Sequence, residues 1–163
     1  MKITKDPILD SWELAESDMR KRPHFHRAAK KCDNQRILIV DDEDSVVLVT
    51  TKILRATMPD NIVIESARNG EEAIQAFAKW HYKVIILDLT MPVMDGEQTA
   101  HAILDMCTES HWEVPSIIFR TGYAPPGDIR NLVASDPAHC LLRKPVRNQT
   151  LTMAVRKRLG LHP

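Results

Sequence analysis

The stretch from Val84 to Gly96, which reads V-I-I-L-D-L-T-M-P-V-M-D-G, constrains the fold of this chain more than any other. Its first four residues form a short uninterrupted apolar run, which is typical of a strand buried on both faces of a parallel sheet. The run stops at Asp88, and the carboxyl end of such a strand is where open α/β sheets bind their ligands. The Met-Pro pair that follows favours an extended or turn conformation, and the closing Asp-Gly pair favours a turn before a helix. The stretch therefore predicts a buried strand, a functional loop and an amphipathic helix, in that order.

The remainder of the chain after residue 35 repeats this alternation of short apolar runs and amphipathic segments. Strands are predicted at residues 37–40, 62–67, 84–87, 116–120 and 140–143. Helices are predicted at about 45–58 and 71–80, from 97 to about 107, from 128 to about 135 and at about 149–159. Strands that alternate with helices indicate a parallel sheet covered on both faces, with right-handed crossover connections.

Two strand orders are common in doubly wound sheets. The chain is too short for a six-stranded dinucleotide-binding fold, and no G-x-G-x-x-G motif follows its first strand. The remaining choice is a flavodoxin-like (βα)5 fold with strand order 2-1-3-4-5, in which ligands bind between the first and third strands.

Helical periodicity also predicts which residues face the core. In the first two helices, the residues expected to point inward are Val46, Val49, Ile53 and Leu54, followed by Ala73, Ile74, Phe77 and Ala78.

Composition narrows the class of protein. With 163 residues, 44% of them hydrophobic and 27% charged, the chain suits one soluble globular domain. A formal net charge of zero argues against a non-specific nucleic-acid binder. The three cysteines, Cys32, Cys107 and Cys140, lack a metal-binding or redox spacing, as is usual in a reducing compartment. No signal peptide and no apolar run of membrane-spanning length is found, so a cytoplasmic protein without membrane insertion is predicted.

Residues 1–34 differ from the rest and are predicted to form an N-terminal extension outside the domain at 35–161. They hold a cluster of basic residues between Arg20 and Lys31 and few large apolar residues. A partly disordered extension with a short helix is favoured, and a docking arm for a partner is the alternative. His24, His26 and Cys32 lie close together in the sequence, but no second pair of metal ligands follows them.

The predicted strands end in polar residues that should converge, because parallel strands end at the same edge of a sheet. The first apolar run is followed by Asp41 and Asp42, the third by Asp88, the fourth by Thr121 and the fifth by Lys144. Carboxylates held together repel one another and raise each other's pKa, so a hard divalent cation among them is expected. Mg²⁺ prefers such oxygen ligands, and Lys144 would add a positive charge beside Asp88.

These residues resemble the receiver domain of two-component response regulators, in which D-x-x-M-P-x-M-D-G follows a central strand. The resemblance covers about residues 36–159. It implies that Asp88 is the phosphoacceptor, with Thr121 and Lys144 as its catalytic partners. It also implies that Mg²⁺ binds to Asp41, Asp42, Asp88 and the backbone carbonyl of Thr90, and that the Lys144-Pro145 bond is cis.

The resemblance further implies a function in signalling. The donor would be a phosphohistidine on a sensor histidine kinase or a phosphotransfer protein, and the product would be an aspartyl phosphate. The signal would pass by conformational change to a downstream protein, without direct DNA binding. The chain is expected to be a single-domain, chemotaxis-type receiver, catalysing only its own phosphorylation and dephosphorylation, since no output module fits after Leu159.

Two departures from the family concern the switch, which comprises Thr121, Leu141 and Tyr123. Many receivers have an aromatic residue where this chain has Leu141, so a muted conformational change is expected. Tyr123 occupies a position that modulates dephosphorylation in the family, and two prolines after it stiffen the loop.

Two other functions, a phosphorylation-independent adaptor and a phosphatase, fit these residues less well. An adaptor that ignores phosphorylation would not need the full set of acids, threonine and lysine. A phosphatase of the haloacid dehalogenase type would need a second aspartate where Thr90 stands.

Overall fold

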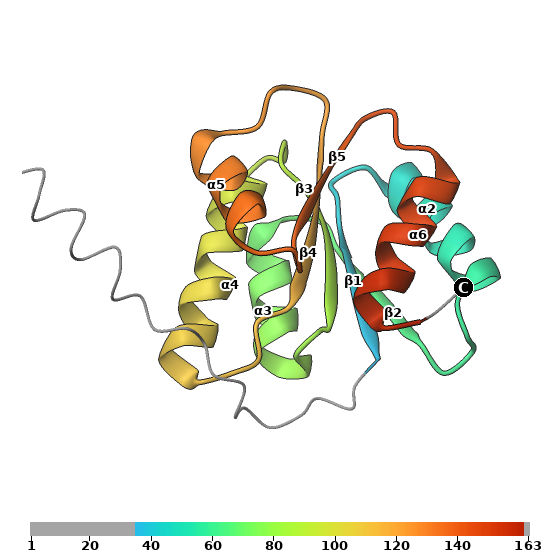
Figure 1. Ribbon diagram of the computed structural model, residues 1–163, viewed down its shortest axis with the longest axis horizontal. Coiled ribbons are helices and arrows are strands. Elements are labelled where there is room, and N and C mark those ends of the chain that lie inside the picture. The colour runs from blue at the N-terminus through green and yellow to red at the C-terminus, as the bar shows by residue number, and fades with distance from the viewer. Residues whose placement is uncertain (1–34, 162–163) are drawn as a thin grey trace, which may run out of the picture.

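The computed structural model describes residues 35–161, in which strands and helices alternate along the chain (Figure 1). The strands are β1 (Arg36–Val40), β2 (Val63–Ala67), β3 (Val84–Asp88), β4 (Ser116–Thr121) and β5 (Cys140–Arg143). The helices are α2 (Asp44–Thr57), α3 (Gly70–Trp80), α4 (Gly96–Ser110), α5 (Gly127–Ser135) and α6 (Asn148–Leu159). The predicted segments are confirmed in order and type, and α4 continues beyond its expected end.

The strands form one parallel sheet in the order β2-β1-β3-β4-β5, which confirms the flavodoxin-like prediction. The central strand β3 pairs with β1 on one side and with β4 on the other. All five residues of β3 are buried, as a strand covered on both faces requires. The sheet therefore places the carboxyl ends of β1 and β3 side by side.

Helices cover both faces of the sheet, with α3, α4 and α5 on one face and α2 and α6 on the other (Figure 1). Phe77 of α3, Ile103 of α4 and Ile129 of α5 belong to one hydrophobic core with the side chains of that sheet face. Leu54 of α2 and Val155 of α6 belong to the second core. Burial of these apolar side chains on two faces is the main force that holds the layers together.

The predicted inward faces of α2 and α3 need correction. Val49 is 54% exposed, and Thr50 is buried beside Leu54 instead. Residues 46–49, in the first half of this helix, are all apolar, and they cannot all face a sheet that covers only one stripe of a helix. In α3, Ala78 is exposed, whereas Ala76 packs against the core.

Local signals explain where two helices begin. The side chain of Asn69 accepts a hydrogen bond from the backbone N–H of Glu72 at 2.9 Å and caps α3. Asp95 and Gln98 form a reciprocal capping box at the start of α4.

Among the helices of residues 35–161, none is both long enough and apolar enough to cross a membrane. The predicted extension at residues 1–34 lies outside the described residues.

Candidate functional site

Three carboxylates gather at the carboxyl edge of the sheet, as the sequence predicts. Asp41 follows β1, Asp42 comes next, and Asp88 is the last residue of β3. One carboxylate oxygen of each lies within 4.8 Å of the others. We call these three residues the acidic rim.

Lys144 lies directly beside the acidic rim. Its Nζ donates a hydrogen bond to Asp88 Oδ2 at 2.7 Å. Its backbone N–H donates to the carbonyl oxygen of Thr121 at 2.8 Å, which ties the end of β5 to the end of β4. The Lys144-Pro145 peptide bond is cis, as the resemblance implied. The cation of Lys144, which directly follows β5, is thus fixed against the carboxylate of Asp88 at the end of β3.

Asp41 is the most deeply buried carboxylate of the rim, with 1% of its surface exposed. Burial raises the pKa of Asp41 above its ordinary value, and the charge of Asp88 adds to this. A hydrogen bond from the backbone N–H of Glu43 to Asp41 Oδ1, at 3.0 Å, acts in the opposite direction and lowers that pKa. Asp41 Oδ2 is buried without a hydrogen-bond partner in the described part of the chain. A buried carboxylate oxygen without a hydrogen-bond partner, on a residue that lies close to two other acids, fits a site for a divalent cation.

Arg120 is a neighbour of the rim that the sequence analysis missed. Its Nη1 lies 3.5 Å from Asp41 Oδ2, and its side chain is only 11% exposed. The contact is an ion pair without hydrogen-bond geometry, since Nη1 and Nε of Arg120 are buried without hydrogen-bond partners among residues 35–161. The available signal was a charged residue in the otherwise apolar strand S-I-I-F-R-T, directly before Thr121.

The proposed switch residues differ in their surroundings. Thr121 is buried, and its hydroxyl donates to the carbonyl oxygen of Tyr123 at 3.0 Å and accepts from its N–H at 3.1 Å. The Tyr123 side chain is 74% exposed. Leu141 is half-buried and packs against the core that α3, α4 and α5 cover. In this structure the Thr121 hydroxyl therefore holds the loop that follows β4.

The loop after β3 is shaped around the Asp88 backbone. The backbone N–H of Thr90 donates to Asp88 Oδ1 at 3.2 Å and orients that carboxylate. A side chain at Gly96 would place its Cβ 2.2 Å from the carbonyl oxygen of Asp88, so only glycine allows α4 to begin this close. Val93, a β-branched residue, has a φ of 71°, which is a strained conformation for such a side chain.

The arrangement brings together every residue that the sequence placed at strand ends. It combines an oriented carboxylate on Asp88, a lysine bonded to it, two further acids and a buried threonine hydroxyl. Such a set can hold a divalent cation and expose a carboxylate oxygen to an electrophile such as phosphorus.

Comparison with known proteins gives a consistent result. A model of the family described as "Response regulator receiver domain" matches residues 37–156. A protein-glutamate methylesterase/protein-glutamine glutaminase of Moorella thermoacetica is 44% identical over 69 residues, 42% of this chain and 16% of that protein. The sensor histidine kinase GacS of Pseudomonas protegens is 29% identical over 126 residues, 77% of this chain and 13% of that protein. The chain therefore spans less than a fifth of the length of these two relatives.

Solved structures show the same architecture. The chemotaxis protein CheY4 of Vibrio cholerae has a TM-score of 0.61 and 26% identity, covering 75% of this chain and 96% of that one. A signal receiver domain from a DNA-binding response regulator of Colwellia psychrerythraea has a TM-score of 0.64 and 25% identity. It covers 77% of this chain and 98% of that one.

Proposed function

This chain belongs to the response regulator receiver domain family of two-component signalling, and we propose that Asp88 is its phosphoacceptor. The observation that carries the proposal is the 2.7 Å hydrogen bond from Lys144 Nζ to Asp88 Oδ2 inside the acidic rim. Asp88 alone among the rim acids has a backbone donor on one carboxylate oxygen and a lysine on the other. It is therefore the carboxylate best oriented to act as a nucleophile.

In the proposed reaction, a carboxylate oxygen of Asp88 forms a bond to phosphorus while the bond between phosphorus and the donor's imidazole nitrogen breaks. The electron pair of the broken bond stays on that nitrogen, so no oxidant or reductant is needed. Lys144 holds the attacking carboxylate in place and offers its charge to the oxygens of the transferred group. Orientation and charge neutralisation, rather than acid–base chemistry, would lower the barrier.

We further propose that Asp41, Asp42 and Asp88, with the backbone carbonyl of Thr90, hold the Mg²⁺ ion that receiver domains generally bind. The orphaned oxygen of Asp41 and the spacing of the three carboxylates support this ligand set. When bound, the ion would neutralise charge on the phosphoryl oxygens. The ion pair between Arg120 and Asp41 would be weakened when a metal takes the same oxygen.

The proposed donor is a phosphohistidine on a sensor histidine kinase or a phosphotransfer protein. A shallow groove between α2 and α6 adjoins the rim, and its lining includes Val49, Arg120 and Leu151. Leu48 and Val49 of α2 are more than half exposed, so the surface beside this groove offers apolar contacts. We infer that a helix of the donor packs here. Val49→Asp should then slow transfer from a donor protein without slowing labelling by acetyl phosphate, and equal rates would refute this.

The proposed output is a conformational change read by a downstream protein. The Thr121 hydroxyl would give up its hydrogen bonds with the Tyr123 backbone and donate one to a phosphoryl oxygen instead. The loop after β4 would then be free to move. Leu141 has no ring to fill the space that Thr121 vacates, so we propose a muted switch. NMR spectra with and without beryllofluoride, a phosphoryl mimic, test it. Amide shifts spread across α5 and β5 would contradict the proposal, whereas shifts confined to the rim, Thr121 and Tyr123 would support it.

We propose that the protein acts in the cytoplasm and signals without direct DNA binding or membrane insertion. Its only chemistry would be transfer of the phosphoryl group to Asp88 and hydrolysis of the product. Residues 1–34 are proposed to lie outside the receiver fold.

Intact-mass measurement after incubation with acetyl phosphate and Mg²⁺ tests the acceptor. The parent chain should gain the mass of one phosphoryl group, and Asp88→Asn should gain none. Asp105→Asn, which removes an exposed acid on α4, is the matched control and should label like the parent. Labelling of Asp88→Asn at the parent's rate would show that another residue is the acceptor.

A further inference from the structure

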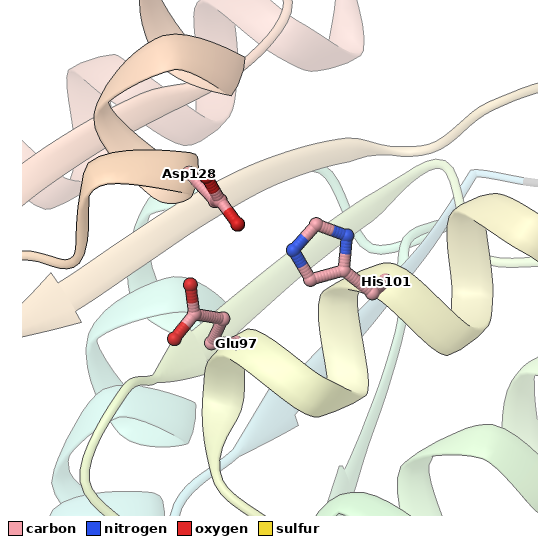
Figure 2. A group of neighbouring side chains, drawn as sticks. All are labelled: Glu97, His101 and Asp128. Carbon is pink, nitrogen blue, oxygen red and sulfur yellow. The ribbon is translucent and has the colours of Figure 1, made fainter.

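A second group of potential metal ligands lies on the helices, outside the acidic rim. Glu97 and His101 come from α4, and Asp128 comes from α5; Figure 2 shows the three side chains pointing toward one another. One ligand atom of each lies within 4.8 Å of the others. We propose that this group, which we call the interhelical cluster, binds a divalent transition-metal ion of the Zn²⁺ class.

The backbone preorganises two of the three ligands. Glu97 and His101 lie four positions apart on α4, so they lie one above the other on the same helix face. Asp128 lies in the first turn of α5 and reaches the same space from the neighbouring helix (Figure 2). Because the helix fixes the backbone positions of Glu97 and His101 relative to each other, an ion needs to order only their side chains and the third ligand.

Within the described part of the chain, no other residue forms a hydrogen bond or ion pair with any of the three side chains. Within residues 35–161, neither carboxylate is within ion-pair distance of a lysine or an arginine, and the His101 ring makes no hydrogen bond or ion pair. Among residues 35–161 they form no hydrogen bond with one another, although a ligand atom of each lies within 4.8 Å of the others. Two ligands about 2.1 Å from a metal are at most about 4.2 Å apart, so the ligand atoms would have to lie within that distance of one another when an ion is bound. Small side-chain rotations would close the remaining gap.

The donor atoms select the class of metal. An imidazole nitrogen with two carboxylate oxygens suits Zn²⁺, Mn²⁺, Co²⁺ and Ni²⁺. The all-oxygen acidic rim suits Mg²⁺ instead. Three protein ligands at an exposed place leave further coordination positions to water, so the bound ion would stay accessible and exchangeable.

The site would join two segments that lead directly to the rim. The helix α4 begins against the backbone of Asp88, as the close approach of Gly96 requires. The helix α5 follows the loop that Thr121 holds. An ion bound by Glu97, His101 and Asp128 would therefore hold the start of α5 to α4 and restrict motion of the loop after β4. The binding itself rests only on the geometry of the cluster and does not require Asp88 to be the acceptor.

Zinc titration by calorimetry, using the full chain with excess Mg²⁺, tests the proposal. The parent should bind one zinc ion that His101→Ala weakens by at least about tenfold. Glu97→Gln and Asp128→Asn should each weaken it as well. The ring resonances of His101 should shift in NMR spectra as zinc is added, which a purely structural role would not produce.

Three controls separate this site from other ligands in the chain. The triple variant His24→Ala, His26→Ala, Cys32→Ser and the rim variant Asp42→Ala should both retain this zinc ion. Glu71→Gln removes an acid from the first turn of α3 and matches Glu97→Gln in its effect on a helix N-terminus; it should bind zinc like the parent. Unchanged affinity in both His101→Ala and Asp128→Asn would overturn the proposal, as would loss of binding in the triple variant.

Discussion

The acidic rim and the interhelical cluster each have three potential ligands within 4.8 Å of one another, but they differ in burial and in neighbouring cations. Two rim acids, Asp41 and Asp88, are buried at strand ends. In the cluster, Glu97 is half-buried and the other two residues are exposed on helices. Lys144 and Arg120 contact the rim, whereas among residues 35–161 no lysine or arginine forms an ion pair with the cluster.

The difference shows that burial decides which acids need a cation from the protein. Water screens exposed carboxylates, so the cluster is stable without a counter-charge. Buried carboxylates lose that screening, and the fold must supply a lysine, an arginine or a metal ion.

The largest effect is expected for magnesium binding. Asp42→Ala removes an exposed ligand of the rim and should weaken Mg²⁺ binding by at least about tenfold. Asp128→Ala removes an acid of the cluster and should leave Mg²⁺ binding unchanged, because that site contains a nitrogen ligand that Mg²⁺ does not favour. Calorimetric titration of both variants gives the two affinities. Similar weakening in both would mean that the two sites are not distinct.

Removing the lysine beside the rim should destabilise the domain, whereas removing an acid of the cluster should not. Lys144→Met leaves Asp88 without its partner and should lower the free energy of unfolding by about 1–2 kcal/mol in metal-free buffer at neutral pH. The loss is smaller than for a fully buried pair because the lysine is partly exposed. Glu97→Gln should change stability by less than about 0.5 kcal/mol. Urea unfolding measures both, and equal losses would refute the role of burial.

Arg120 should compete with the metal for Asp41. Arg120→Met frees Asp41 Oδ2 and should strengthen Mg²⁺ binding about three- to tenfold, equivalent to about 1 kcal/mol. Arg130→Met, an exposed arginine of α5, is the matched control and should have no effect. Weaker binding in Arg120→Met would show that the arginine orients Asp41 for the metal instead of competing with it.

The smallest effect concerns pH. Burial raises the pKa of Asp41 above 3.8, so between 3.8 and the raised pKa the folded state binds more protons than the unfolded state. The contribution of Asp41 to stability is therefore fully present below pH 3.8 and is lost as pH rises through the raised pKa. Asp41→Asn should lack this dependence.

Metal-free urea unfolding at a series of pH values measures this difference. The stability of the parent relative to Asp41→Asn should fall as pH rises through this window. Asp105→Asn controls for loss of an exposed negative charge. A parent that gained stability over Asp41→Asn with rising pH would have an Asp41 pKa below its ordinary value.

Most of the rim, together with its neighbours Thr121 and Lys144, could be predicted from the sequence for a simple reason. Parallel strands end at the same edge, so a list of the residues that follow each apolar run contains Asp41, Asp88, Thr121 and Lys144. The contact of Arg120 with Asp41 could not be predicted in this way, because it depends on the direction in which the Arg120 side chain extends from the sheet. The exposure of Val49 could not be predicted either, because it depends on how much of α2 the sheet covers.

The interhelical cluster could not be predicted from the sequence, for a different reason. The spacing of Glu97 and His101 is readable from the sequence, since they lie four positions apart on a predicted helix. Asp128 lies on another helix, and its direction is set by the packing of α5 beside α4. No periodicity in the sequence encodes that contact.

The hydrogen bond between Lys144 and Asp88 also has a consequence for synthesis of the chain. It joins residues 56 positions apart, and Asp41 comes from a third strand still earlier in the sequence. A ribosome that has released only the first three strands has made all the acids but not the lysine. Long-range contacts of this kind form late, because loop closure must precede them. An unfinished or half-folded chain would therefore lack the lysine contact of the proposed acceptor site, which only the finished domain contains.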